Sequence, residues 1–167
     1  MSNAKKDITT REDIELLMNT FYSRLLADES INYIFTDVAR INMQTHMPIL
    51  ADFWESILLN KNVYQNNTMK IHMDLNEKAP LTKTHFDTWL NHFNTTVDEL
   101  FEGNIALLAK QRARSVATIM QIKIAQNIKA LNKIQGLQII LRYYCPGGLC
   151  PFPRWRIAAS ISLSFAN

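Results

Sequence analysis

Apolar residues recur in this sequence at the spacing of an amphipathic helix, and this spacing is the strongest constraint on the fold. Between residues 10 and 28 they follow an i, i+3, i+4, i+7 rhythm, which places them on one helix face. Thr10 and Asp13 resemble a capping box, because each side chain can accept a backbone amide hydrogen near the helix start. The predicted buried face of this helix comprises Ile14, Leu17, Met18, Phe21, Tyr22, Leu25 and Leu26.

Three more long segments carry the same helical spacing: residues 45–59, a helix from residue 82 that Gly103 ends, and residues 105–131. Shorter helical turns are predicted at residues 31–35 and 68–74. No segment alternates with period two, so no sheet is expected. The sequence therefore predicts an all-α protein. Periodicity alone does not choose between a plain helix bundle and a globin-like fold.

Helix boundaries and buried faces can also be predicted. Thr45 is a candidate N-cap, and Pro48 would then lie in the first turn, where its missing amide costs nothing. The predicted buried face of that second helix comprises Ile49, Leu50, Phe53, Trp54, Ile57 and Leu58. The predicted buried face of the last helix comprises Leu108, Ala109, Ala113, Val116, Ile119, Met120, Ile124 and Ile128.

The distribution of charge argues against a nucleic-acid partner. The net charge of +3 arises from residues 133–167, which hold Lys133, Arg142, Arg154 and Arg156 and no acidic residue. The rest of the chain is nearly neutral and offers no basic face for phosphates. No apolar run is long enough to predict a membrane span. The first residues lack the apolar core of a secretion signal, so we expect a cytoplasmic protein.

The C-terminal segment differs from the preceding helices, and we predict that residues 132–167 are an atypical tail, disordered or non-native. It contains Cys145 and Cys150, which could form a small disulfide loop or half of a metal site. Two free thiols are the favoured interpretation, since no matching Cys or His spacing accompanies the pair. The sequence also lacks a glycine-rich phosphate loop and the common hydrolase and zinc motifs.

The four histidines differ in context. His85 and His92 share one flank of a predicted helix, and solvated side chains are favoured over a metal pair. His46 lies at a helix start, where it could be a surface residue or a neighbour of the helix cap. His72 lies between apolar residues on a short element, and the residues alone favour a buried, hydrogen-bonded histidine over a ligand.

Together, several residues resemble the truncated haemoglobins, and group III in particular, over roughly residues 7–131. His46, Trp89 and the lack of Gly-Gly pairs at the helix breaks favour group III. The matching order is Phe21-Tyr22, then His46 seven residues before Phe53-Trp54, then Ile71-His72 with Leu75, then Trp89-Leu90 with Phe93.

This resemblance implies a shortened globin domain, residues 7–131, in which two helix pairs cross as a 2-over-2 sandwich. It implies a haem b whose iron is bound by His72. Tyr22 and Trp89 would line the opposite, distal side, with His46 at the pocket mouth. The residues implied to contact the haem are Phe53, Trp54, Ile71 and Leu75.

The implied function is reversible binding of diatomic gases, namely O2, NO and CO. Tyr22 O–H and Trp89 N–H are hydrogen-bond donors, and two donors favour slow release over oxygen transport. That favours nitric oxide or peroxide detoxification, with an unidentified reductase as partner, and leaves open whether the chain is an enzyme. The alternative is a cofactor-free helical bundle that acts in interaction or regulation. A hydrolase or transferase using His46 or His72 as base is less favoured, because no nucleophile accompanies either residue.

Overall fold

The structure, a computed structural model, describes residues 5–144, and the elements found there are all helical. The described residues fall into two units divided after Ile124. The prediction of an all-α protein is confirmed. The elements are α1 (Arg11–Ala27), the single π-helical turn η1 (Ile34–Val38), α2 (Met43–Leu58), α3 (Thr68–Lys78), α4 (Lys83–Leu100) and α5 (Asn104–Tyr144).

Helix α1 begins at the predicted capping box. The Thr10 hydroxyl accepts the Asp13 amide hydrogen, and the Asp13 carboxylate accepts the Thr10 amide hydrogen. Lys6 also forms an ion pair with Asp13, whose side chain is only 2% exposed. Burial raises the pKa of Asp13, but the Lys6 ammonium and the backbone amides outweigh it and lower the pKa to about 2. The carboxylate therefore stays charged inside the first turn and stabilises it.

Asp7 caps the start of α5. Its carboxylate accepts the amide hydrogens of Ile105 at 2.9 Å and Ala106 at 2.8 Å. Gly103, just before the helix, has φ +147°, and a Cβ there would lie 2.3 Å from the Asp7 Cγ. Glycine is needed at position 103 because the backbone angle disfavours other residues and because a side chain there would clash with Asp7.

The start of α2 differs from the prediction. Asn42, not Thr45, is the N-cap, and its side chain accepts the Gln44 amide hydrogen at 3.0 Å. The Thr45 hydroxyl instead donates to the Asn42 carbonyl at 3.1 Å. Pro48 consequently lies inside the helix rather than in its first turn. An asparagine caps as well as a threonine, and only the backbone path selects between them.

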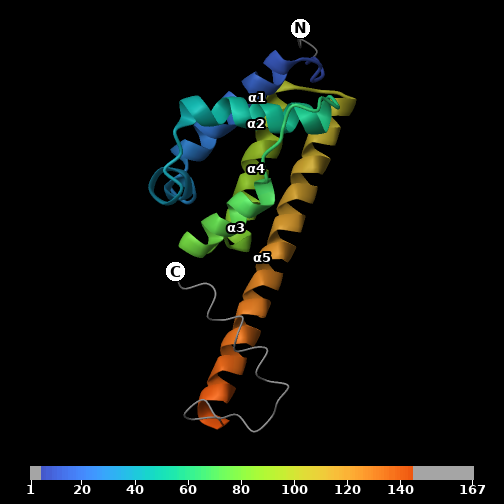
Figure 1. Cartoon of the computed structure of the whole chain (residues 1–167). Coiled ribbons are helices and arrows are strands. Elements are labelled where there is room, and N and C mark those ends of the chain that lie inside the picture. Colours follow the sequence, from blue (N-terminus) through green and yellow to red (C-terminus); the bar gives the residue numbers. More distant parts are fainter. Residues whose placement is uncertain (1–4, 145–167) are drawn as a thin grey trace. The chain divides into compact units, whose positions relative to one another are not determined.

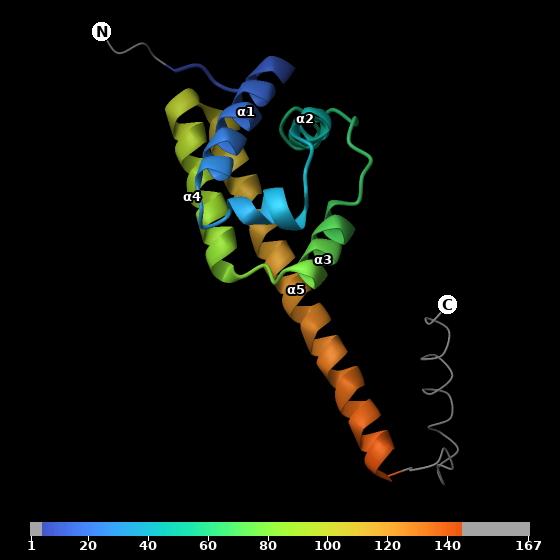
Figure 2. The same ribbon diagram turned by 90° about the vertical axis from the view of Figure 1, so that its left-hand side faces the viewer.

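Helix α1 packs against both α2 and α4. Figure 1 shows α2 lying across the direction of α4 and of the first part of α5, and Figure 2 shows α1 alongside α4 with α2 seen nearly end-on. Arg11 of α1 donates to the carboxylates of Asp52 and Glu55 on α2. Arg24 of α1 pairs with Glu99 of α4. Charged contacts therefore surround the apolar contacts of α1 on both sides.

The main core lies where α1, α2, α4 and the start of α5 meet. On α5, small side chains do much of the packing: Ala106, Ala109, Ala113 and Ala117 are at most 3% exposed. The predictions that Ile49, Ile119 and Ile128 are buried were wrong, since they are 38%, 50% and 45% exposed. The buried residues of the main cluster are Ile8, Ile14, Leu17, Met18, Phe21, Tyr22, Leu25, Ile31, Ile34, Ala51, Trp54, Leu58, Phe93, Val97, Phe101, Ala106, Ala109 and Ala113.

Two helix ends lie further along the chain than predicted. Helix α3 continues to Lys78, beyond the segment 68–74, and α5 continues to Tyr144, beyond residue 131. No proline interrupts α5, and the next proline is Pro146. The Cys145–Cys150 segment lies outside the described residues. Between residues 5 and 144, no helix has the length and apolar character needed to cross a bilayer.

Candidate functional site

His72 lies on α3 and is half-buried. The Asn67 side chain caps this helix by accepting the Lys70 amide hydrogen at 3.0 Å. One turn later, the His72 Nδ1 atom lies 2.8 Å from the Thr68 carbonyl oxygen. Burial lowers the pKa of His72, and the opposing effect of the Thr68 carbonyl is smaller. The ring is thus neutral, Nδ1 carries the proton that it donates to Thr68, and the Nε2 lone pair remains available.

His46 lies in the early part of α2 and is half-buried. Burial is the main cause that lowers the pKa of His46, and His72 lowers it further when it is protonated. The His46 ring also faces the edge of the Tyr22 ring, with 6.0 Å between the ring centroids. The side chains of Tyr22 on α1 and His46 on α2 thus lie next to each other.

Tyr22 is buried at 7% exposure, and burial alone raises the pKa of its phenol. Its ring contacts Phe21 edge-on at 5.2 Å and Phe35 at 5.8 Å between centroids. Within the described residues, the buried side-chain atom that lacks a hydrogen-bond partner is Asn94 Oδ1, not the Tyr22 hydroxyl. As a phenol, Tyr22 carries an O–H group that can donate a hydrogen bond.

The predicted tryptophans belong to a larger aromatic cluster. Trp89 stacks on Phe93 with 5.5 Å between centroids and meets Phe21 edge-on at 5.4 Å. Trp54, 2% exposed, stacks on the same Phe93 at 4.6 Å. Phe53 meets Trp54 edge-on at 5.5 Å. These stacked contacts connect α1, α2 and α4 and fix the orientation of both indoles.

The two apolar neighbours of His72 are not equivalent. Leu75 is half-buried and packs against the main core, whereas Ile71 is 53% exposed. The structure therefore places Tyr22 beside His46 and packs Leu75 against the main core, but it leaves Ile71 at the surface.

His85 and His92 were expected to be solvated, and both instead make structural contacts. The His85 Nδ1 atom accepts the Thr82 amide hydrogen at the start of α4, and its Nε2 lies 3.1 Å from the Tyr33 hydroxyl. His92 Nε2 lies 2.7 Å from an oxygen of Asp28, and this hydrogen bond is the main cause that lowers the pKa of Asp28 to about 2. Helical periodicity predicts which side of a helix a residue lies on, but not which residues of other segments pack against that side.

Sequence reasoning missed two aromatic residues beside these side chains, Phe35 and Tyr64. Phe35 follows the first residue of η1 and contacts Tyr22. Tyr64 lies in the loop before α3, contacts Phe53, and places its hydroxyl 2.6 Å from the Thr68 hydroxyl. An aromatic residue in an otherwise polar, asparagine-rich loop was the available signal for Tyr64.

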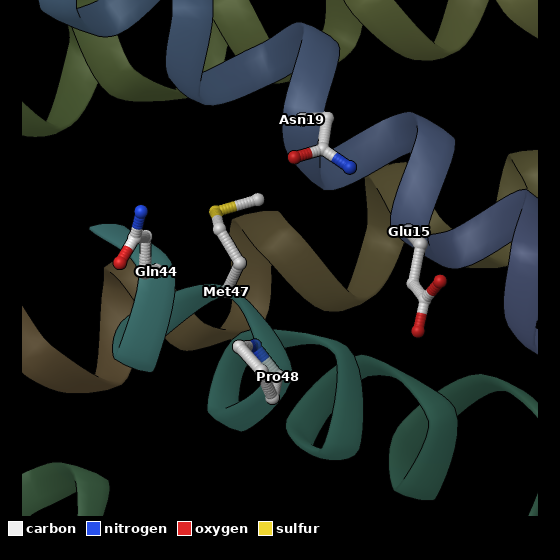
Figure 3. A pocket seen from close by; sticks show the side chains of 5 residues that line it. All are labelled: Glu15, Asn19, Gln44, Met47 and Pro48. Carbon is white, nitrogen blue, oxygen red and sulfur yellow. The ribbon is translucent and has the colours of Figure 1, made fainter.

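A separate cavity of about 250 Å³ lies between α1 and α2. Figure 3 shows Glu15 and Asn19 of α1 on one side and Gln44, Met47 and Pro48 of α2 on the other. None of the predicted site residues lines it. Within residues 5–144, no three His, Cys, Asp or Glu side chains are grouped as ligands of a metal ion.

Comparison with a solved structure supports the predicted fold. A solved structure of the group III truncated haemoglobin from Campylobacter jejuni matches with a TM-score of 0.64 and 24% identity, over 72% of this chain and 94% of that chain. The fold is that of a truncated haemoglobin. The predicted 2-over-2 globin-like architecture is therefore confirmed.

The sequence points to the same family. A group 3 truncated haemoglobin from Campylobacter jejuni is 25% identical over 120 residues, which is 70% of this chain and 92% of that protein. No family model matches. The resemblance to the group III truncated haemoglobins is confirmed by the two matches together.

Proposed function

We propose that residues 7–131 bind a haem b through the Nε2 atom of His72, and that the bound haem takes up O2, NO and CO. The observation that carries this proposal is the 2.8 Å contact between His72 Nδ1 and the Thr68 carbonyl. A histidine that ligates a metal commonly donates its other ring N–H to a backbone carbonyl, which fixes the tautomer and the ring orientation. The similarity to group 3 truncated haemoglobin supports the same assignment.

The residues present fit this group. A porphyrin supplies four nitrogens of its own, so one protein imidazole suffices to hold the iron. When bound, haem supplies an iron with a free coordination position for a small ligand. The neutral His72 imidazole, with Nε2 unprotonated, has the right chemistry for the protein ligand. The Tyr22 hydroxyl, on a ring that packs against Phe21 and Phe35, would provide the polar group needed on the other side.

Tyr22 and Trp89 would act as hydrogen-bond donors toward a bound diatomic molecule. Because burial raises the pKa of Tyr22, its hydroxyl keeps its proton at neutral pH. A donor in such a setting contributes about 1–3 kcal/mol, which corresponds to roughly a 5- to 150-fold slower ligand release. Two hydrogen-bond donors favour retention of the bound diatomic ligand over its rapid release. We therefore propose chemistry on bound oxygen, nitric oxide or peroxide, with His46 near the pocket mouth and a separate reductase as electron donor.

The apolar contacts proposed for the haem divide into two kinds. Phe53 and Leu75 are half-buried, and Ile71 is exposed, so each has apolar surface available to a flat ring. Trp54 is already stacked on Phe93 and supports Phe53 from the core side. A bound haem that covered Phe53, Leu75 and Ile71 would bury apolar surface that the protein alone leaves accessible to solvent.

The decisive experiment is hemin titration followed in the Soret region. Wild-type protein is expected to bind one hemin per chain. His72→Ala is expected to raise the rate of haem loss by more than about 100-fold, because it removes the iron's only protein ligand. His85→Ala and His92→Ala serve as controls, with circular dichroism to verify that each variant folds. Equal haem loss in all three variants would refute the assignment of His72. A wild-type protein that takes up no hemin would favour the cofactor-free bundle.

Tyr22→Phe tests the distal side in the same protein. It removes the hydroxyl but keeps the ring that packs on Phe21. Oxygen release, measured by stopped-flow after ligand displacement, is expected to accelerate roughly 5- to 150-fold. An unchanged release rate would show that the Tyr22 hydroxyl does not contact the ligand.

A further inference from the structure

The loop between α2 and α3 is held against α2 by hydrogen bonds from its backbone amides to a side chain of α2. Asn60 leaves α2 with φ +55°, a left-handed conformation that ends the helix. The Ser56 hydroxyl then accepts the amide hydrogens of Val63 at 3.3 Å and Tyr64 at 3.0 Å. Figure 2 shows this loop running from α2 to the start of α3. Its conformation is thus fixed from the α2 side.

Tyr64 connects this anchored loop to α3. Its ring meets the Phe53 ring of α2 edge-on, with 5.1 Å between centroids. Its hydroxyl lies 2.6 Å from the hydroxyl of Thr68, the first residue of α3. We call Ser56, Tyr64 and the Thr68 hydroxyl the Tyr64 bridge. It joins a well-packed helix to one that has no buried residue.

The bridge ends at the residue that orients His72. The same Thr68 whose hydroxyl meets Tyr64 offers its carbonyl to the His72 Nδ1–H at 2.8 Å. The packing of α3 comes from partly buried side chains: Met69 and Met73 pack against the cluster that contains Phe86, and Leu75 packs against the main core. The Tyr64 hydroxyl adds a polar contact at Thr68 itself. A displacement of Thr68 would move the acceptor of the imidazole and change both the ring orientation and the electron density at Nε2.

We propose that Tyr64 is a positioning residue for His72, acting through the hydrogen bond between the Tyr64 and Thr68 hydroxyls. Tyr64 does not itself contact the haem in this proposal. The bridge keeps the Thr68 carbonyl in place and thereby holds the His72 imidazole in one tautomer and one orientation. It also links the position of α3 to α2, which carries His46. This inference rests on the proposed role of His72 as the iron ligand.

The test uses substitutions that remove one hydroxyl at a time. Tyr64→Phe keeps the ring against Phe53, and Thr68→Val keeps the size and the carbonyl of residue 68. Thr68→Ser retains a hydroxyl and serves as the conservative variant. Tyr33→Phe is the matched control, because the Tyr33 hydroxyl is also paired, with His85, but has no connection to α3.

Three measurements separate positioning from general stability. They are the rate of haem loss to an apoglobin acceptor, the iron–histidine stretching frequency in the resonance Raman spectrum of the ferrous protein, and the amide hydrogen exchange of α3 without haem. Tyr64→Phe and Thr68→Val are each expected to accelerate haem loss about three- to tenfold, as the loss of one neutral hydrogen bond predicts. Both should shift the stretching frequency in the same direction. The double variant should resemble the singles, since both remove one bond.

Thr68→Ser and Tyr33→Phe are expected to stay within about twofold of wild type in haem loss. The proposal is overturned if Tyr64→Phe matches Tyr33→Phe in haem loss and stretching frequency while His72→Ala still loses haem rapidly. If His72→Ala retains haem like wild type, the proposed function fails and the role of Tyr64 fails with it. If wild-type protein binds no hemin, the proposed function and the role of Tyr64 are both overturned. If the amides of α3 exchange equally fast in Tyr64→Phe and wild type, the Tyr64 bridge does not constrain α3.

Discussion

Helices α1 and α3 carry the two principal residues of the proposed site, Tyr22 and His72, yet they are held in very different ways. Seven residues of α1 are buried, and its start has a reciprocal capping box. None of the residues of α3 is buried, and a single asparagine side chain caps it. The proposed distal donor therefore lies on the part of the molecule most determined by packing. The proposed ligand lies on a helix held by partly buried side chains, namely Met69, Met73 and Leu75, and by polar contacts at its start.

This difference has a physical consequence for binding. Elements with few buried contacts open locally at low free-energy cost, and ligand-binding elements are often of this kind. Helix α3 would gain from haem the burial that the protein alone does not give it. Helix α1 gains little, because its inner face is already buried.

The largest expected difference between the two helices is in stability. Phe21→Ala removes a fully buried side chain of α1 and is expected to lower the free energy of unfolding by about 3–5 kcal/mol. Leu75→Ala, on the half-buried face of α3, should cost only about 1–2 kcal/mol. Urea denaturation of the haem-free proteins measures both. Equal losses would mean that α3 is as much a part of the core as α1.

Hydrogen exchange sharpens the comparison without any substitution. In haem-free protein, the amides of α3 are expected to exchange about ten- to a hundredfold faster than those of α1. Mass spectrometry resolves the two helices, and α4, which is also well buried, serves as an internal reference. Adding hemin should slow exchange chiefly in α3. Protection that rises equally in all helices would contradict a local role for α3.

The smallest expected effect concerns the acidic cap of α1. The pKa of Asp13 lies near 2 in the folded protein, below its ordinary 3.8. A group with a lowered folded pKa contributes stability that is present above pH 4 and lost as the pH falls toward 2. Asp13→Asn should therefore cost about 1–3 kcal/mol at neutral pH and flatten the acid limb of the stability curve.

Asp87→Asn is the matched control for this substitution. Asp87 forms an exposed ion pair with Lys83 one turn away, and such pairs contribute about 0.5 kcal/mol or less. An acid limb that is equally steep in wild type and Asp13→Asn would show that Asp13 is not held as an ion in the folded protein.

Local patterns predicted the parts of the fold that depend on neighbours in sequence. Interactions between residues a few positions apart determine three such features. They are the capping box at Thr10 and Asp13, the inner face of α1, and the end of α4 before Gly103. The same local logic failed at α2, where Asn42 and Thr45 were both acceptable caps and the incoming chain selected the first. It also failed on α5, where exposed Ile119 was predicted to be buried, whereas Ala117 is 1% exposed and belongs to a second buried cluster with Phe86 and Met120.

The sequence by itself determined the helices, because periodicity and capping act over one or two turns. It also determined the resemblance that singled out His72, Tyr22 and Trp89 as candidates. Only the tertiary structure decided that His46 lies beside Tyr22, that His92 pairs with Asp28, and that Tyr64 meets Thr68. Those contacts depend on how far apart helices distant in sequence lie and at what angle they cross. Side-chain size sets both, and small side chains such as the alanines of α5 allow helices to approach closely.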